Sequence, residues 1–161
     1  MHAMNEENSH MTNDISKKMA LAAIDALEDK KAEDIQIIDD YAHHPGELSA
    51  TIDAVRTMGY KRIIFAFQPH TYTRTKALFD DFVEQLKRPD IVVLAEIYAA
   101  RERNTIGISS KDLQAQIPGS HYCKTLPEVT DWLKENVQPR DLVLTVGAGD
   151  IYRAGEAFLK E

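Results

Sequence analysis

Four short polar segments hold most of the residues whose types could do chemistry. DDYAHHPGE at 39–47 combines acidic, aromatic and imidazole side chains, and QPHTYTRT at 68–75 adds a histidine and an arginine. IYAARE at 97–102 and GAGD at 147–150 contribute a further arginine and a pair of glycines. Each segment directly follows a run of apolar residues, so the order of the chain links every one of them to a buried element.

These groups fit an anionic ligand. His70 and Arg74 are four residues apart, and the planar guanidinium of arginine can hold a carboxylate or a phosphate with two hydrogen bonds. Backbone N–H groups at Gly147 to Asp150 could bind a second anionic group, and the two oxygens of Asp40 suit a ribose diol. The pattern therefore predicts a site for a nucleotide-like or amino-acid-like ligand.

Each segment also has a purely structural interpretation. Pro45 and Asp150 are typical of helix starts, and each histidine taken singly is more often a hydrogen-bonded structural group. The paired glycines could form only a tight turn, and the arginines could belong to a solvated loop. These readings do not explain why such residues follow four separate apolar runs.

The apolar runs have the character of strands covered on both faces. Four of them are rich in β-branched residues and nearly continuously apolar, and a weaker fifth is short: 35–38, 62–67, 91–96, 142–146 and 121–124. Helical spacing of apolar residues occurs between them, at 46–58, 73–86, 110–117, 126–137 and 150–159. Alternating strands and helices predict an α/β fold of the Rossmann-like type, with a mostly parallel twisted sheet of five to six strands and helices on both faces. Parallel strands have their carboxyl ends on the same side of the sheet, so the four polar segments are expected together on that side, the carboxyl edge. Ligands of such sheets bind outside the carboxyl ends of the strands.

The N-terminal part is expected to differ from the rest. Residues 1–12 have the composition of a disordered tail or a cloning remnant, and residues 13–30 carry apolar residues at helical spacing. The chain of 161 residues fits one domain, at 13–161.

Composition excludes several classes of function. The net charge of −7 argues against a nucleic-acid partner, because such affinity depends on clustered lysine and arginine. Cys123 is the single cysteine, so neither an intrachain disulfide nor a multi-thiolate metal site is expected. No apolar run is long enough to span a bilayer, which predicts a cytoplasmic protein without a membrane partner. The chain also lacks a G-x-x-x-x-G-K-[ST] phosphate loop, an H-E-x-x-H pair and a G-x-S-x-G elbow.

DDYAHHPGE, FQPHTYTRT, EIYAARE, GISS and VGAGDI, in this order and spacing, resemble the C-terminal domain of the UDP-N-acetylmuramate:L-alanine ligases, a branch of the Mur ligase family of bacterial peptidoglycan synthesis. The resemblance covers residues 37–161. It implies an ATP-dependent amide ligase, in which the muramate carboxylate is phosphorylated and the amine of L-alanine attacks the acyl phosphate. ATP and magnesium are implied as cofactors, and L-alanine, UDP-N-acetylmuramate and the other ligase domains as partners.

The resemblance also implies roles for individual residues. Those expected to line the amino-acid and acyl-phosphate side are Tyr41, His43, His70 and Arg74. Those expected to contact the nucleotide are Asp40, Gly147, Ala148 and Gly149. This chain departs from the family pattern at Gly46, where many members have threonine, and at Thr71, where some have arginine. Recognition of the alanine carboxylate should therefore rest more heavily on Arg74.

The rest of the ligase is not found in this sequence. The family's UDP-binding domain and central ATPase domain, with its phosphate loop and magnesium ligands, do not match any part of it. Phosphoryl transfer depends on those parts, so the chain alone is expected to be inactive.

Residues 12–39 show a second, shorter resemblance, to the opening helix and strand of the iojap-like ribosomal silencing factors. The two resemblances meet inside one predicted strand, as they would in a chimera whose helix 13–30 is of foreign origin. The alternative function is accordingly a chimeric or structural binding module that uses the ligase-derived sheet as a scaffold. Retained ligand binding would separate it from a ligase domain.

A metal-dependent hydrolase is a third class. It would use Asp39, Asp40, His43 and His70. Adjacent side chains on a strand point to opposite faces, so Asp39 and Asp40 are not expected to share an ion, and no metal site is predicted.

Overall fold

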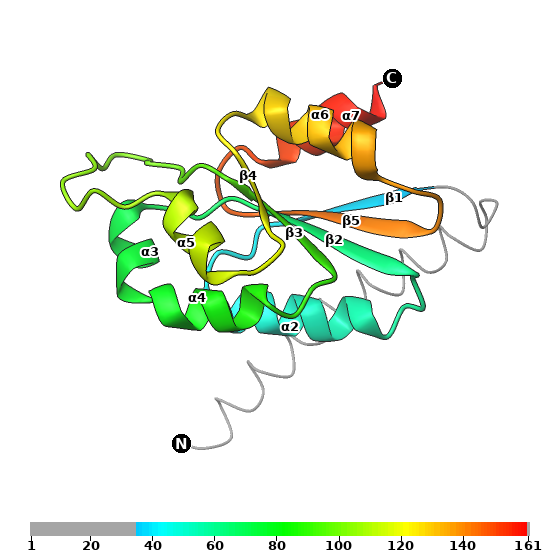
Figure 1. The fold of residues 1–161 in the computed structure, drawn as a ribbon, viewed down its shortest axis with the longest axis horizontal. Helices are drawn as coiled ribbons and strands as arrows, with labels where there is room; N and C mark the ends of the chain where they lie inside the picture. Colours follow the sequence, from blue (N-terminus) through cyan, green and yellow to red (C-terminus); the bar gives the residue numbers. More distant parts are fainter. Residues whose placement is uncertain (1–34, 161) are drawn as a thin grey trace, which may run out of the picture.

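A parallel five-stranded sheet forms the centre of the protein. The computed structural model describes residues 35–160, and the predicted tail and helix at 1–30 lie outside them. The strands are β1 (Gln36–Asp40), β2 (Arg62–Phe67), β3 (Ile91–Ala95), β4 (His121–Cys123) and β5 (Asp141–Val146). Their order in the sheet is β1-β5-β2-β3-β4, and every neighbouring pair is parallel (Figure 1). The α/β fold class predicted from the sequence is confirmed.

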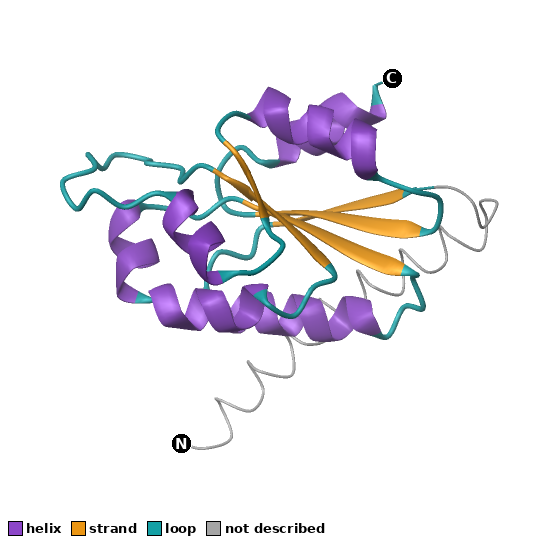
Figure 2. Ribbon diagram, in the orientation of Figure 1, coloured by secondary structure: helices purple, strands orange, loops and turns teal. Residues whose placement is uncertain are grey.

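Helices cover both faces of this sheet. They are α2 (Pro45–Arg56), α3 (Tyr72–Ala77), α4 (Phe79–Leu86), α5 (Ser110–Gln116), α6 (Leu126–Asn136) and α7 (Tyr152–Leu159). The first four lie on one face and α6 and α7 lie on the other (Figures 1 and 2). Among these described residues, no helix is long and apolar enough to cross a membrane.

The prediction of one continuous helix over 73–86 was wrong, because the helix is interrupted. The segment forms two helices, α3 and α4, that meet at Leu78, whose φ of −113° and ψ of 22° leave the helical region. Neither glycine nor proline marks this position, so nothing local in the sequence indicated the break. It frees α4 to bury Phe82 and Leu86 completely, while α3 remains with the loops at the end of the sheet.

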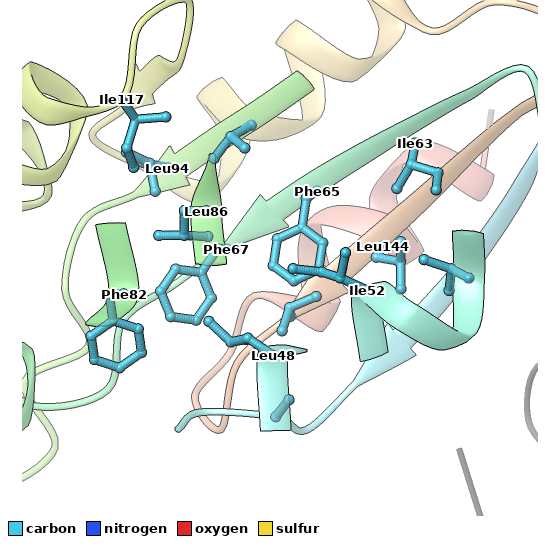
Figure 3. Close-up of a cluster of buried hydrophobic side chains, with 14 of the residues drawn as sticks. Leu48, Ile52, Ile63, Phe65, Phe67, Phe82, Leu86, Leu94, Ile117 and Leu144 are labelled. Atoms are coloured by element: carbon cyan, nitrogen blue, oxygen red, sulfur yellow. The ribbon is translucent and has the colours of Figure 1, made fainter. Parts of the chain in front are cut away.

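Alternation along the strands divides the core into two layers. Phe65 and Phe67 point to the α2 and α4 side, where they pack with Phe82, Leu48 and Ile52 (Figure 3). The intervening residues of β2 pack with α6 and α7 on the other side. Burial on both faces explains why the strands read as continuous apolar runs rather than alternating ones.

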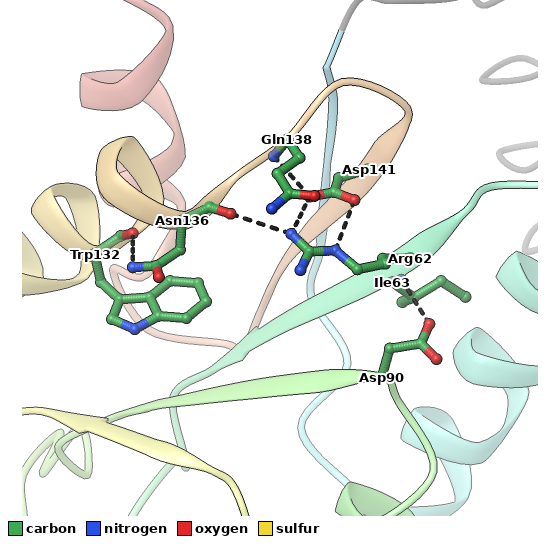
Figure 4. A network of polar contacts seen from close by, with 7 residues as sticks. All are labelled: Arg62, Ile63, Asp90, Trp132, Asn136, Gln138 and Asp141. Carbon is green, nitrogen blue, oxygen red and sulfur yellow. Dashed lines mark hydrogen bonds and ion pairs between the residues drawn. The ribbon is translucent and has the colours of Figure 1, made fainter.

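The amino edge of the sheet, where the strands begin, and the carboxyl edge, where they end, carry different kinds of polar residues. At the amino edge, Arg62 donates from Nε to Asp141 Oδ1 at 3.0 Å and from Nη2 to Asp141 Oδ2 at 2.7 Å. Arg62 also reaches the carbonyl of Asn136, while Asp141 accepts from the amide of Gln138 (Figure 4). Asp141 is almost fully buried, so these groups satisfy one another and join β2, β5 and the end of α6.

Candidate functional site

The four polar segments meet at the carboxyl edge of the sheet, as the sequence predicted. Asp40 and Phe67 are both paired with Val146, so β1, β5 and β2 end at the same level. Beyond them, the rings of His43 and His70 are 6.1 Å apart between centroids, and His70 stacks on Tyr98 at 5.5 Å. This edge is the candidate site.

Asp39 and Asp40, the last two residues of β1, make hydrogen bonds to different parts of the protein. Asp39 Oδ1 accepts from Thr145 Oγ1 at 2.8 Å, whereas Asp40 accepts from the Ala42 amide at 3.1 Å and from the hydroxyl of Thr51. Burial raises the pKa of Asp39; the hydrogen bond from Thr145 opposes this and the nearby Asp40 adds to it. Because their carboxylates diverge, the pair does not form one metal site. Both oxygens of Asp40 already accept a hydrogen bond within the protein, and its contact with a nucleotide stays a prediction.

The two histidines after β1 have different roles. His44 is the N-cap of α2, and its Nδ1 accepts from the amide of Gly46 at 3.2 Å. His43 Nδ1 lies 3.1 Å from the carbonyl oxygen of Tyr41 and 3.6 Å from Glu47 Oε1. The ring of Tyr41 is 68% exposed and meets His43 edge-on at 5.6 Å. His43 therefore lies toward His70 with the exposed ring of Tyr41 beside it, while His44 caps α2.

His70 follows β2 and lies beside His43, and Arg74 is in the first turn of α3. Nδ1 of His70 is buried and has no hydrogen-bond partner among the described residues. Burial lowers the pKa of His70, the nearby Arg74 and His43 lower it further, and Glu102 opposes them. The half-buried guanidinium of Arg74 has no hydrogen-bond partner among residues 35–160. A half-buried, unpaired guanidinium is well suited to binding an anion.

The start of α3 is fixed by unusual local geometry. Thr71 has a φ of 68°, in a region that threonine rarely occupies, and its Oγ1 accepts from the Arg74 amide at 3.4 Å. Glu102, from the loop after β3, accepts from the amides of Tyr72 and Thr73 at 2.7 and 3.0 Å. Hydrogen bonds from Thr73 lower the pKa of Glu102. Strained backbone persists where its surroundings hold it, and here it orients the helix that carries Arg74.

The GAGD turn is held by a glutamine that sequence reasoning missed. Gln68 Oε1 accepts from the amides of Asp150 and Ile151 at 3.0 and 3.2 Å, and Gln68 Nε2 donates to Asp150 Oδ1 at 2.8 Å. The Gly147 amide donates to the carbonyl of Asp40 at 3.0 Å. Of the predicted anion-binding amides, those of Gly147 and Asp150 are thus already paired. Within the described part of the chain, the amides of Ala148 and Gly149 have no acceptor and remain for a ligand.

Tyr98 and Glu96 are two further residues whose roles the sequence did not reveal. Tyr98 lies between two of the polar segments, because a Cβ on Gly149 would come within 2.6 Å of its ring. Glu96 accepts from Ser109 Oγ at 2.8 Å, from the Ser110 amide at 3.0 Å and from the hydroxyl of Tyr122. Burial acts to raise the pKa of Glu96, but these hydrogen bonds outweigh it and lower the pKa. The feature of the sequence that could have indicated a role for Gln68, Glu96 and Tyr98 was their position at the ends of predicted strands.

Residues 35–160 contain no group of three or more histidine, cysteine, aspartate or glutamate side chains placed to hold a metal ion. Of the residues that a hydrolase would use, His43 and His70 lie close together, but Asp39 and Asp40 accept hydrogen bonds from different residues, Thr145 and Thr51. The geometry thus offers no support for the hydrolase alternative.

Fold and site together define a Rossmann-like α/β domain with a cluster of imidazole, phenol and guanidinium groups at the carboxyl edge of its sheet. The sequence model for the Mur ligase glutamate ligase domain matches residues 26–149, and the chain belongs to this family.

Full-length relatives are ligases. The chain is 49% identical over 133 residues to the UDP-N-acetylmuramate–L-alanine ligase of Caldanaerobacter subterraneus and 47% identical over 135 residues to that of Agathobacter rectalis. These matches cover 80% and 81% of this chain but 29% of each relative. The chain therefore spans under a third of the length of these relatives. None of these matches supports the resemblance of residues 12–39 to iojap-like factors, and the family match itself begins at residue 26.

Solved structures agree with the fold. The UDP-N-acetylmuramate–alanine ligase of Thermotoga maritima superposes with a TM-score of 0.65 at 25% identity, over 81% of this chain and 27% of that one. A murein peptide ligase of Psychrobacter arcticus gives a TM-score of 0.61 over 81% of this chain and 28% of its own, at 15% identity. This second likeness bears on the fold alone.

Proposed function

We propose that this chain is the C-terminal domain of an ATP-dependent ligase that joins L-alanine to UDP-N-acetylmuramate. The observation that carries the proposal is 49% identity to such a ligase over 80% of the chain. The candidate site supports it, since imidazole, phenol and guanidinium groups from separate segments lie near one another there, and the guanidinium of Arg74 has no hydrogen-bond partner among the described residues. The module 13–161 would act as one domain of the larger enzyme.

The proposed roles follow from the groups available. Arg74 binds the carboxylate of L-alanine through its unpaired guanidinium, and Tyr41, His43 and His70 line the side where the acyl phosphate lies. The neutral amine of L-alanine attacks the acyl carbon, the new C–N bond forms as the C–O bond to phosphate breaks, and phosphate leaves as hydrogen phosphate, with the proton that the amine nitrogen loses. Donors aimed at the acyl oxygens stabilise the charge that develops there.

ATP, when bound, supplies the phosphoryl group that activates the muramate carboxylate. Asp40 and the amides of Ala148 and Gly149 are the groups of this domain that could reach a nucleotide. The described residues do not gather three metal ligands, so we assign magnesium and most phosphate contacts to the family's central domain. The chain by itself is accordingly expected to be inactive, and nucleotide-linked substrates place the reaction in the cytoplasm.

A domain exchange tests this function. The matching 133 residues of the Caldanaerobacter ligase are replaced by those of this chain, and ATP-dependent addition of L-alanine is measured. We expect an active enzyme. Arg74→Ala should reduce kcat/KM for L-alanine about 10- to 100-fold, the value of one lost hydrogen bond to a charged group.

Lys76→Ala is the matched control, because Lys76 is an exposed cation two residues further along α3. It should leave kcat/KM within about twofold. A folded but inactive exchange protein, together with a chain that binds neither ATP nor an acyl-phosphate analogue in calorimetry, would contradict the ligase function and favour the scaffold alternative.

A further inference from the structure

Tyr98 connects three loops of the carboxyl edge. Its amide donates to the carbonyl of Pro69 and its carbonyl accepts from the amide of Thr71, both at 2.8 Å. Its ring stacks on His70 with an interplanar angle of 20°. The space that a Cβ of Gly149 would need is also taken by this ring, at 2.6 and 2.8 Å. Tyr98 therefore fixes where His70 can lie.

The two nitrogens of His70 have different surroundings. Nδ1 is buried and unpartnered. Nε2 has no hydrogen-bond partner in the described structure but is not among the buried unpaired atoms, so it is open to solvent or to a ligand. A neutral imidazole has one N–H and one lone pair, and an unpaired buried donor is costly. Buried N–H groups without a partner are rarer in proteins than under-satisfied acceptors. The ring is thus most stable with its proton on Nε2.

We propose that Tyr98 is the positioning residue of His70, and that it holds the imidazole as the neutral Nε2–H tautomer, which donates a hydrogen bond to an oxygen of the anionic substrate. His70 then stabilises charge on the acyl phosphate and does not remove the proton of the attacking amine. This inference rests on the proposed ligase function for the identity of the substrate.

The charges around His70 agree with this arrangement. Arg74 on α3 and His43 from the loop after β1 disfavour a second proton on the ring, and Glu102 from the loop after β3 favours one. Desolvation is larger than any of these. A doubly protonated ring would also bury an unsatisfied N–H at Nδ1. Neutral His70 remains a donor across the physiological pH range, since its donating nitrogen does not depend on protonation.

Nitrogen NMR on the ligand-free, ¹⁵N-histidine-labelled chain tests the proposal. The resonances of His70 are assigned by their loss in His70→Gln. We expect Nε2 to carry the proton and Nδ1 to be unprotonated above the titration, in a ratio of about tenfold, as one unsatisfied buried N–H would impose. His70 should titrate below the ordinary histidine value.

Variants separate positioning from general stability. Tyr98→Phe keeps the ring and should keep both the tautomer and the titration of His70. Tyr98→Ala should raise the pKa of His70 and mix the tautomers, and Gly149→Ala, which pushes on the ring of Tyr98, should change them in the same direction. A proton on Nδ1 in the unmodified chain would overturn the proposal, as would a Tyr98→Ala protein that is folded and unchanged in its His70 signals.

The measurement needs no substrate and no ATPase domain. Its failure is therefore distinguishable from failure of the domain exchange, which tests only the ligase function. In an active exchange protein, Tyr98→Ala should lower kcat with a smaller change in KM for L-alanine. The separate variant Tyr98→Phe should have the kcat of the exchange protein with Tyr98.

Discussion

Glu96 shows what single residues at the carboxyl edge contribute besides ligand contacts. Its carboxylate joins the end of β3 to the start of α5 and to Tyr122 of β4. The ring of Tyr122 is partly buried, and that burial together with the hydrogen bond to Glu96 raises the pKa of Tyr122 to about 12. One acid thus holds the outer strands and the loop that contains Tyr98 in place.

Lowering the pH should weaken the hydrogen bonds that Glu96 accepts. Because the folded-state pKa of Glu96 is below its ordinary value of 4.5, its stabilisation is complete above pH 4.5 and is lost as the pH falls through the lower, folded-state pKa. We expect the free energy of unfolding in urea to fall less steeply below pH 4.5 in Glu96→Gln than in the unmodified chain. Tyr122→Phe removes one of the bonds to Glu96 and should give an intermediate slope. Identical slopes for all three proteins would show that Glu96 does not contribute.

At the scale of elements, the turn between β5 and α7 is shaped by close contacts. Gly147 has a φ of 152°, and a Cβ there would lie 2.8 Å from the carbonyl oxygen of Gln68. The turn can approach β2 this closely only because it lacks a side chain at that position. Its glycines therefore serve packing as well as any ligand.

Gly147→Ala should accordingly destabilise the domain by about 2–3 kcal/mol, from backbone strain and overpacking together. Gly119→Ala is the matched control, since Gly119 has a φ of 79° but no atom within 4 Å of an added Cβ. It should cost about 1 kcal/mol. Chemical unfolding of both variants measures the difference, and equal losses would show that the contact with Gln68 is not limiting.

Elements also mark where sequence reasoning succeeded and where it could not. The strands and most helices followed from runs of apolar residues, because burial on two faces leaves a distinct pattern. The break at Leu78 and the positive φ of Thr71 had no such pattern. Beside Thr71, the start of α3 is held by Glu102, which is 30 residues away from Tyr72 in the chain.

For the molecule as a whole, the polar residues of the two sheet edges serve different purposes. The amino edge is closed by the pair of Arg62 and Asp141, whose groups bond one another and the backbone. At the carboxyl edge, Arg74 and Nε2 of His70 have no hydrogen-bond partner within residues 35–160. That the four polar segments come together could be predicted, because parallel strands all end at one edge. Its internal pairing, through Gln68 and Tyr98, required distances between loops that no spacing in the sequence encodes.

Removing one member of the closed pair should be costly. Asp141→Ala leaves the Gln138 amide without its acceptor and Arg62 with only the carbonyl of Asn136, and we expect the free energy of unfolding to fall by about 3–5 kcal/mol. Asp53→Ala breaks the exposed pair of Arg88 and Asp53, whose side chains are 30% and 65% exposed, and should cost less than about 1 kcal/mol. Thermal and urea unfolding compare the two. A loss as small for Asp141 as for Asp53 would contradict a structural role for the amino edge.

The strand order has a consequence for synthesis of the protein. β5 is the last strand in the sequence, yet it lies between β1 and β2. As the chain emerges from a ribosome, β2, β3 and β4 can pair in turn, but β1, whose one neighbour among the described strands is β5, must wait until residues 141–146 are made. Closure of the sheet then brings together segments about one hundred residues apart, a long-range step of the kind that slows folding. The candidate site, whose loops follow β1, β2, β3 and β5, can form only after that final insertion.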